Sequence, residues 1–359
     1  FEYSGVNTLD QTNEGSGNGT SLATGNITTT VADELLIAGA VTTSSTSFST
    51  WSNSFTEQHD FVVGGMGMQI TAGGADRIVA STGTYSTTAS SSNSGNWRAQ
   101  IASFSQTAST IDISGTCQQL DLTNCTDTGT VAVAVNGTLQ GQTQPIVAGS
   151  WTISGVTAPS AGDVITVFIQ GAAAAGNRAV AVTKYDGSGN ITGVELIEQH
   201  LTIGSDDNQT IANADLSQYY NSVNGTNDVF HDVDVANDLT VDTTGLLSDE
   251  KLYIKTGNTF RPDAASSGNI STLDIEINGT LTADGNTFTV GRHWDMTDGT
   301  FNYDTSTVDF TGTGTISNDN ASWWLKQFYN VNAAAAGQVT TVLATRGMDV
   351  LNILTLGSG

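Results

Sequence analysis

Apolar residues in this chain alternate with Thr, Ser or Asp, and glycine interrupts them about every six to twelve residues. That two-residue period is the pattern of a strand, because successive side chains of a strand point to opposite faces of the sheet. A helix requires a period near 3.6 residues, and only the short stretch 213–220 favours one. The sequence therefore predicts an all-β protein built from short strands and turns.

The 359 residues exceed what one core usually organises, so two or three domains are expected. Five strand-like segments in residues 1–105 predict a jelly-roll-like β-sandwich. Four more in residues 106–200 predict an immunoglobulin-like β-sandwich. Residues 201–359 carry irregularly spaced, strand-sized repeats, with related motifs at Asn278-Gly-Thr-Leu and Gly312-Thr-Gly-Thr-Ile. Such self-similarity predicts a β-solenoid or β-helix-like region.

Several of these segments resemble known modules. Asp33-Glu-Leu-Leu-Ile-Ala, Gly83-Thr-Tyr-Ser-Thr and Trp97-Arg-Ala-Gln-Ile-Ala-Ser-Phe occur in an order that resembles the concanavalin-like jelly-roll modules of large secreted bacterial and phage surface proteins. Residues 201–359 resemble the β-solenoid repeats of adhesin-type proteins. The resemblance covers most of the chain and implies an architecture, with no particular chemistry.

The chain is strongly acidic. It has 10 Lys plus Arg against 35 Asp plus Glu, a net charge of −25 and a pI near 4.1. This charge repels nucleic acid and anionic lipid, so neither is expected as a partner. No run of apolar residues reaches the length of a membrane-spanning helix, so membrane insertion is not expected.

The first residues predict how copies of the chain associate. The chain begins with Phe and has no signal peptide, so we expect a processed mature form or a segment of a longer protein, located outside the cell or on its surface. The segment Phe1-Glu2-Tyr3-Ser4-Gly5-Val6 is either the first strand of its own sandwich or a strand that pairs with a neighbouring unit. The second alternative predicts a homopolymer.

Two cysteines, Cys117 and Cys125, have seven residues between them, a spacing that fits no zinc or redox motif. A short disulfide loop is predicted, with two free thiols as the alternative. Ten Asn-x-Ser/Thr triplets are candidate N-glycosylation sites if the source cell glycosylates. They begin at Asn18, Asn26, Asn124, Asn136, Asn190, Asn208, Asn224, Asn269, Asn278 and Asn320.

Candidate chemistry is sparse. The four histidines are far apart in the sequence, and no Gly-x-Ser-x-Gly motif is present, so we expect no enzyme. The acidic cluster Asp232, Asp234 and Asp238 could bind calcium, form a carboxylate pair for glycoside hydrolysis, or lie on a solvated turn. Calcium is the one cofactor that the sequence suggests.

Tryptophans supply the remaining candidate contacts. Trp323 and Trp324 are adjacent, so on a strand their rings would point to opposite faces, and one of them is expected to contact a partner. Trp51 and Trp97 could stack against sugars, although single tryptophans in sandwich strands usually belong to the core.

The sequence thus favours a structural subunit or stalk segment of an extracellular filament or cell-surface fibre, assembled through β-strand pairing between units. The alternative is a glycan-binding, lectin-like adhesin module of a microbial or viral surface protein.

Overall fold

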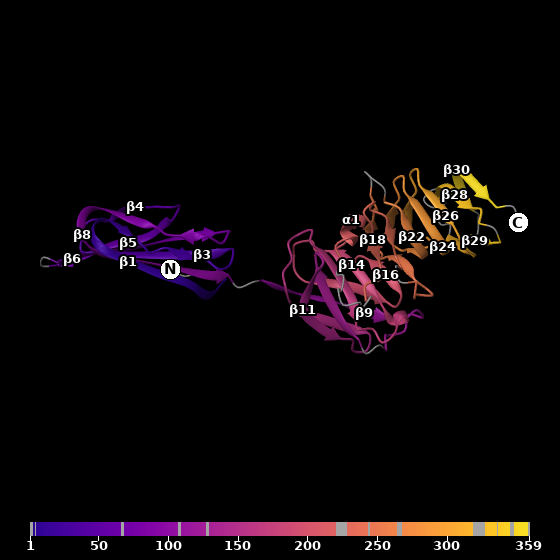
Figure 1. The fold of residues 1–359 in the computed structure, drawn as a ribbon, viewed down its shortest axis with the longest axis horizontal. Coiled ribbons are helices and arrows are strands. Elements are labelled where there is room, and N and C mark those ends of the chain that lie inside the picture. Colours follow the sequence, from indigo (N-terminus) through magenta and orange to yellow (C-terminus); the bar gives the residue numbers. More distant parts are fainter. Residues whose placement is uncertain are drawn as a thin grey trace. The chain divides into compact units, whose positions relative to one another are not determined.

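The computed structural model describes residues 3, 5–65, 68–106, 109–126, 129–219, 228–242, 245–263, 268–318, 327–335, 337–344 and 348–357. Almost all regular structure in this part of the chain is β, as predicted, and the α-helix α1 spans Asn213–Leu216. The chain divides into two compact units, Phe1–Ser109 and Thr110–Gly359 (Figure 1).

Unit 1 is built around an antiparallel six-stranded sheet. The sheet has the order β1-β8-β3-β6-β5, and β4 pairs with β8 beside it. Its strands are β1 (Val6–Ala23), β3 (Glu34–Thr42), β4 (Phe48–Trp51), β5 (Thr56–Gly65), β6 (Met68–Val79) and β8 (Thr88–Gln106), with a small sheet formed by β2 (Ile27–Thr28) and β7 (Thr84–Tyr85).

Alternation along the strands separates the two faces of this sheet. Leu36, Ala38 and Ala40 of β3 point into a core that also contains Trp51 and Ile101. The residues between them point to the opposite, open face. Unit 1 therefore has one packed face and one that is partly exposed, since Ile37 is half-buried and Gly39 and Val41 are exposed.

Unit 2 begins with two facing sheets. One has the order β12-β9-β15, and the other begins β11-β10-β13-β14. Their strands are β9 (Thr110–Gln118), β10 (Thr130–Val135), β11 (Thr138–Pro145), β12 (Ser150–Thr157), β13 (Val164–Gln170), β14 (Val180–Lys184) and β15 (Ile191–Ile197). In β10, Val131 and Val133 enter the core between the sheets, while Ala132 enters a second core. Burial on both faces explains why this strand and β13 are almost continuously apolar.

The second sheet does not stop at the end of this sandwich. β14 pairs in parallel with β16 (His200–Ile203), and further parallel strands extend the same sheet to β30. Residue 200, the expected border between the middle and C-terminal domains, is the first residue of β16. The two parts therefore share one sheet and the core on one of its faces.

From β16 onward the chain winds in coils that stack in parallel. One stack joins β16, β20, β22, β24, β27 and β29, a second joins β17, β21, β23 and β25, and a third joins β19, β22, β24, β26, β28 and β30. The bounds are β17 (Thr210–Ile211), β18 (Asp232–Val233), β19 (Leu239–Thr240), β20 (Lys251–Ile254), β21 (Thr259–Phe260), β22 (Ile270–Ile277), β23 (Thr280–Thr282), β24 (Thr287–Asp295), β25 (Thr300–Asn302), β26 (Thr307–Phe310), β27 (Gly314–Asn318), β28 (Gln327–Ala333), β29 (Thr340–Ala344) and β30 (Asp349–Leu356).

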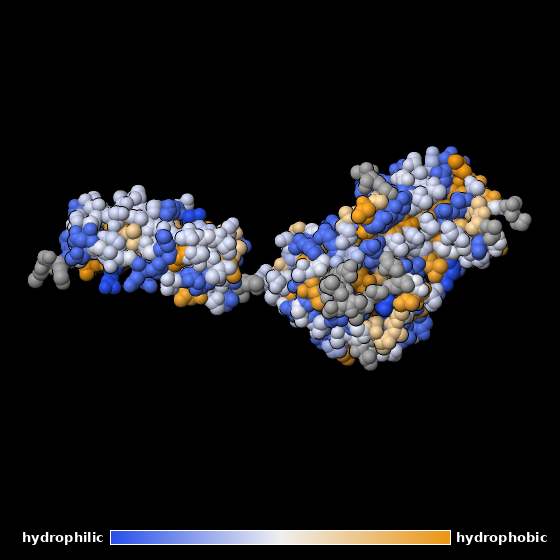
Figure 2. All heavy atoms as spheres, viewed as in Figure 1, coloured by the Kyte–Doolittle hydropathy of each residue, from blue (hydrophilic) through white to orange (hydrophobic). Residues whose placement is uncertain are grey.

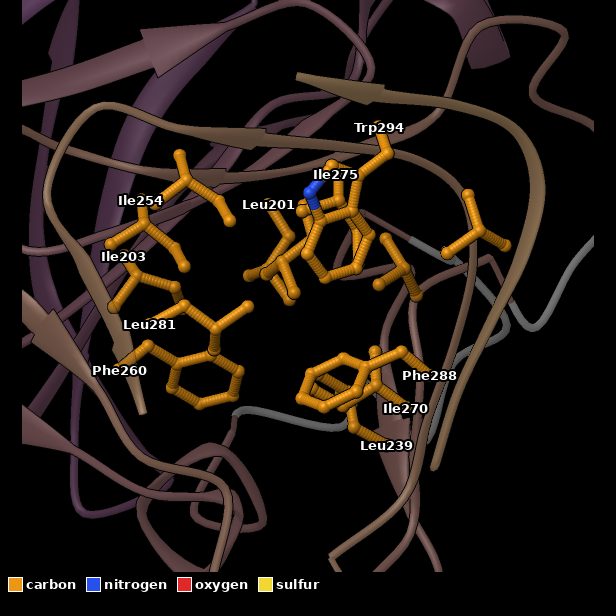
Figure 3. Close-up of a cluster of buried hydrophobic side chains, with 14 of the residues drawn as sticks. Leu201, Ile203, Leu239, Ile254, Phe260, Ile270, Ile275, Leu281, Phe288 and Trp294 are labelled. Carbon is orange, nitrogen blue, oxygen red and sulfur yellow. The ribbon is translucent and has the colours of Figure 1, made fainter. Parts of the chain in front are cut away.

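Equivalent positions of successive coils stack their side chains into one core. Leu201, Leu252, Ile275, Trp294 and Ile316 follow one another in register, and each is at most 1% exposed. Figure 3 shows three members of this column, Leu201, Ile275 and Trp294, together with buried residues of the other two stacks: Phe260, Leu281, Leu239, Ile270 and Phe288. Each coil thus buries its apolar side chains against its neighbours, as repeat proteins do.

Candidate functional site

The last described coil, formed by β29 and β30, exposes positions that are core in every earlier coil. Val342 continues the column of Ile316 but is 37% exposed, and Leu354 continues the column of Val331 but is 47% exposed. Val331 itself is 2% exposed. We call the strands β29 and β30 the terminal coil. Val342 and Leu354 are apolar because they occupy the same register positions as the core residues of the preceding coils, and no further described coil covers them.

The terminal coil also has unpaired strand edges. Within the described residues, β30 pairs only with β28, and β29 pairs only with β27. Further apolar side chains, Leu343, Leu351, Ile353 and Leu356, are each at least half exposed. Figure 2 shows hydrophobic surface at this end of unit 2, over β30. A free edge beside apolar side chains is the surface to which another strand adds.

The outer face of the first stack carries charged residues that pair across neighbouring coils. Arg292 on β24 donates to Asp274 on β22 through Nη2–Oδ2 at 2.7 Å and Nε–Oδ1 at 3.1 Å, and to Asp249 through Nη1–Oδ1 at 2.9 Å. The Nζ of Lys251 on β20 lies 2.6 Å from the Oε2 of Glu276 on β22. We call these five residues the inter-coil charge cluster. The cluster joins adjacent coils, and hydrogen bonding from Arg292 lowers the pKa of Asp249.

Two buried titratable groups lie next to this cluster. Burial, and then the nearby charge of Lys251, lower the pKa of His200 to about 4. Burial raises the pKa of Glu250 to about 7, and its Oε1 accepts a hydrogen bond from the backbone N–H of Leu273 at 2.5 Å. Glu250 is 9% exposed, so these groups affect folding stability and offer little surface to a substrate.

The predicted acidic cluster is divided among separate hydrogen bonds. Asp232 accepts from the hydroxyl of Tyr219 at 2.8 Å, and Asp234 accepts from the backbone N–H of Asp238 at 2.9 Å. Asp238 accepts from the backbone N–H of Asn269, also at 2.9 Å. No set of three or more His, Cys, Asp or Glu side chains suited to a metal occurs within the described residues. Calcium binding at these aspartates stays a prediction that their hydrogen bonds do not favour.

The two cysteines form the predicted disulfide. Cys117, at the end of β9, is bonded to Cys125, and both are buried in the core between the two sheets of unit 2. The alternative of two free thiols is therefore wrong.

The candidate glycosylation sites differ in exposure. Asn224 and Asn320 lie outside the described residues. Asn269 and Asn278 are half-buried in the coils. The exposed ones are Asn18, Asn26, Asn124, Asn136, Asn190 and Asn208.

The N-terminal segment associates with its own unit in the part that the structure describes. Val6 begins β1 and pairs with Gln106 of β8, and the hydroxyl of Tyr3 donates to Asp76 at 2.7 Å. Gly5 precedes β1, with a positive φ of 74°. Phe1, Glu2 and Ser4 lie outside the described residues. This arrangement favours the first of the two predicted alternatives, a strand of its own sandwich.

The tryptophans take different places. Trp51 is 9% exposed and belongs to the core of unit 1, whereas Trp97 is half-buried at the edge of that core. Trp323 and Trp324 lie outside the described residues, so their contact with a partner stays a prediction.

Sequence reasoning missed the inter-coil charge cluster. Its signal is faint, because Lys251 and Asp274 are register partners on successive coils, and Arg292 directly precedes the register partner of Asp274, but these positions are spaced irregularly in the sequence. Without the register, nothing indicates that these residues are neighbours.

Comparison with known proteins adds little. No protein-family model and no curated protein matches the chain. One solved structure, a Corynebacterium diphtheriae protein named for a proposed membrane anchor, is similar at 10% sequence identity and a TM-score of 0.12, over 52% of this chain and 52% of that chain. The chain thus spans about half the length of that protein, and so low a TM-score carries no argument. None of the described helices is long and apolar enough to cross a membrane.

Proposed function

We propose that the chain is a structural subunit or stalk segment of an extracellular filament or cell-surface fibre, assembled through β-strand pairing between units. In this proposal residues 1–105 are a jelly-roll-like sandwich, residues 106–200 an immunoglobulin-like sandwich, and residues 201–359 a β-solenoid-like stalk. The disulfide between Cys117 and Cys125 supports an extracellular place, because disulfides persist in oxidising compartments.

The observation that carries the proposal is the terminal coil. Its column positions, Val342 and Leu354, are apolar and exposed, and the outer edges of β29 and β30 have no strand partner among the described residues. A strand from a second copy would bury these side chains and satisfy the free backbone groups at once.

The same sheet has a second free edge. Its strand order begins at β11 and ends at β30, so within the described chain each of these strands has one pairing partner in the sheet. Pairing of β30 with β11 of the next copy would be a heterologous contact. Contacts of that kind repeat into an open filament when the rotation between copies does not close a ring.

The proposal includes no catalytic role. The charges of the inter-coil charge cluster pair with one another, and such pairs hold successive coils together. Calcium is likewise not required by it.

Electron microscopy and light scattering of the purified full chain test the proposal. We expect fibres or oligomers that grow with concentration, and we expect Leu354→Lys to abolish them by placing a charge on the terminal coil. Val235→Lys is the matched control, because Val235 is fully exposed on a turn far from the terminal coil. Discrete monomers of the unmodified chain at every concentration, or assembly unaffected by Leu354→Lys, would refute it.

A further inference from the structure

A row of polar side chains on the outer face of the coils ends at the terminal coil. Asn330 on β28 donates through Nδ2 to the hydroxyl of Thr307 on β26 at 3.2 Å, and Asn352 on β30 donates through Nδ2 to the Oδ1 of Asn330 at 2.9 Å. We call Thr307, Asn330 and Asn352 the amide row. Each asparagine donates to the coil before it, so the Oδ1 of Asn352 is the acceptor offered to a strand added beyond β30.

The amide row links the last described coil to the stack without charge. An earlier pair of coils is joined by the ion pair of Arg292 with Asp274, whereas Asn352 joins β30 to β28 through two amides. β30 has eight residues, of which only Asp349 is charged. In a chain with a net charge of −25, a strand with so little charge repels a second copy less than the acidic surface does.

β11, at the other edge of the same sheet, has a matching character. It also has eight residues, none of them charged, and glutamine recurs at every second position as Gln140, Gln142 and Gln144. The side chain of Gln142 points toward the facing sheet, because its Nε2 donates to the carbonyl of Gly155 on β12 at 2.9 Å. An amide nitrogen carries two N–H groups, so a glutamine that donates one of them keeps another.

The two faces of the shared sheet can be followed from β11 to β30. Leu139 on β11 packs against the core of the coils, which also contains Val331, the register partner of Leu354. Because side chains alternate along a strand, the glutamines next to Leu139 point to the opposite, outer face, where Asn352 bonds to the amide row. A second copy that continues the sheet with its faces unchanged therefore brings its glutamines beside Asn352 and its Leu139 beside Leu354.

Keeping the faces unchanged also fixes the direction of the added strand. β11 pairs antiparallel with β10, β10 with β13 and β13 with β14, and each later neighbour on the path to β30 is parallel. β11 thus runs opposite to β30, and a following copy in the same orientation pairs the two strands antiparallel. Turning that copy over would make the pair parallel, but it would exchange the faces and place the glutamine amides on the apolar column of Leu354, where they lack partners.

We propose that β11 of a second copy pairs antiparallel with β30, with its glutamines extending the amide row and its Leu139 covering Leu354. This inference rests on the proposed function, because it assigns the partner of the terminal coil. It adds the direction of the strands, the faces that meet and the residues that select the pairing. With Leu139 opposite Leu354, antiparallel pairing also sets Thr138 opposite Thr355.

Oxidative cross-linking of the full chain tests the direction and the faces. Thr138→Cys combined with Thr355→Cys should give a series of disulfide-linked multimers that disappears on reduction, because both positions are exposed and lie directly opposite each other in this pairing. Within one copy they lie at opposite edges of the sheet, so a bond between them must join two copies. Thr138→Cys combined with Leu356→Cys is the control, because Leu356 follows Thr355 and points to the other face of β30, so this pair should not cross-link.

The variant Asn352→Ala tests the amide row, because it removes the acceptor offered to the second copy. We expect the concentration needed for assembly, read by light scattering, to rise several-fold. Asn18→Ala is the matched control, because Asn18 is also exposed and donates through Nδ2 to the Oδ1 of another asparagine, Asn96, at 2.8 Å, but lies in unit 1. Assembly of this control should equal that of the unmodified chain.

The outcomes separate this inference from the fibre proposal. Cross-links in the Leu356 pair alone, or in neither pair while light scattering shows assembly, would overturn the inference and leave the fibre proposal standing. Equal assembly of Asn352→Ala and Asn18→Ala would overturn the role of the amide row. Absence of assembly in the unmodified chain would overturn both the inference and the fibre proposal.

Discussion

Gly299 lies where neighbouring coils come closest. A Cβ atom at this position would lie 2.2 Å from the carbonyl oxygen of Ile277 and 2.7 Å from that of Gly279. Both obstacles are backbone atoms of the preceding coil, so they cannot move without shifting a strand connection. Glycine at this position is therefore a steric requirement of the stack.

We expect Gly299→Ala to destabilise the protein by about 1–3 kcal/mol, as overpacking of a tight site usually does. The free energy of unfolding from urea titration measures this. Gly141→Ala is the control, since an added Cβ atom there meets nothing within 4 Å, and its stability should change by less than about 1 kcal/mol. Equal effects of the two substitutions would contradict this account of the coils.

Glu250 makes stability depend on pH. Its pKa is raised from 4.5 to about 7 by burial, so the folded chain keeps this proton over a range in which the unfolded chain releases it. Between pH 4.5 and about 7 the folded state binds more protons than the unfolded state. The contribution of Glu250 to the free energy of unfolding is therefore full below pH 4.5 and falls by roughly 3 kcal/mol as the pH rises through about 7.

Replacing Glu250 with Gln removes this titration. We expect the urea midpoint of Glu250→Gln, relative to the unmodified chain, to rise between pH 4.5 and pH 8. Comparing the two proteins at each pH cancels the contributions of other groups, such as His200. A constant difference across this range would show that Glu250 ionises normally in the folded chain.

At the scale of elements, the sequence predicted central strands of the sheets better than edge strands. β10 and β13 lie within the part, residues 106–200, where strand-like segments were expected, and burial on both faces makes these two strands conspicuously apolar. β1 has 18 residues and was not predicted in full, because within it only Leu22 is buried and most of the other residues are polar or glycine. Edge strands carry little hydrophobic signal, since they gain most of their stability from backbone pairing.

Pairing partners were harder to predict than strands. The parallel contact of β14 with β16 joins parts that sequence patterns assigned to different domains. The surface hollows of unit 1 were also not predictable, because alternation identifies a solvent-facing side of a sheet but not whether that side is hollow. The disulfide was predictable, since its two cysteines are close in sequence and suit no metal motif.

The disulfide should stabilise its own surroundings rather than the whole of unit 2. It closes a short loop beside β9, where the N–H of Cys117 bonds to the carbonyl of Gly149 at 2.7 Å. We expect the double substitution Cys117→Ala and Cys125→Ala to cost less than about 3 kcal/mol, because short loops lose little entropy on closure. Hydrogen exchange should quicken near Asn124 and Gly149 and stay unchanged in β24. Faster exchange throughout the coils would mean that the disulfide supports the entire stack.

At the scale of the whole molecule, the cores determine how many parts unfold separately. Unit 1 has its own core, around Leu36 and Ile101. The two cores of unit 2 lie on opposite faces of one sheet, because β10 sends Val133 into one and Ala132 into the other. Because this sheet forms one wall of both cores, its unfolding would expose the side chains of both cores at once.

We therefore expect two unfolding transitions, one for unit 1 and one for unit 2. The three domains suggested by the sequence would instead give three. Leu36→Ala should lower the free energy of unfolding of unit 1 by about 2–5 kcal/mol, because Leu36 is fully buried in that unit. The transition of unit 2 should be unchanged. Val133 and Leu252 lie in different cores of unit 2, but Val133→Ala and Leu252→Ala should both lower the free energy of the same transition, that of unit 2. Calorimetry measures all three variants. A third transition, shifted by Val133→Ala and not by Leu252→Ala, would mean that the shared sheet does not couple the middle of the chain to its coils.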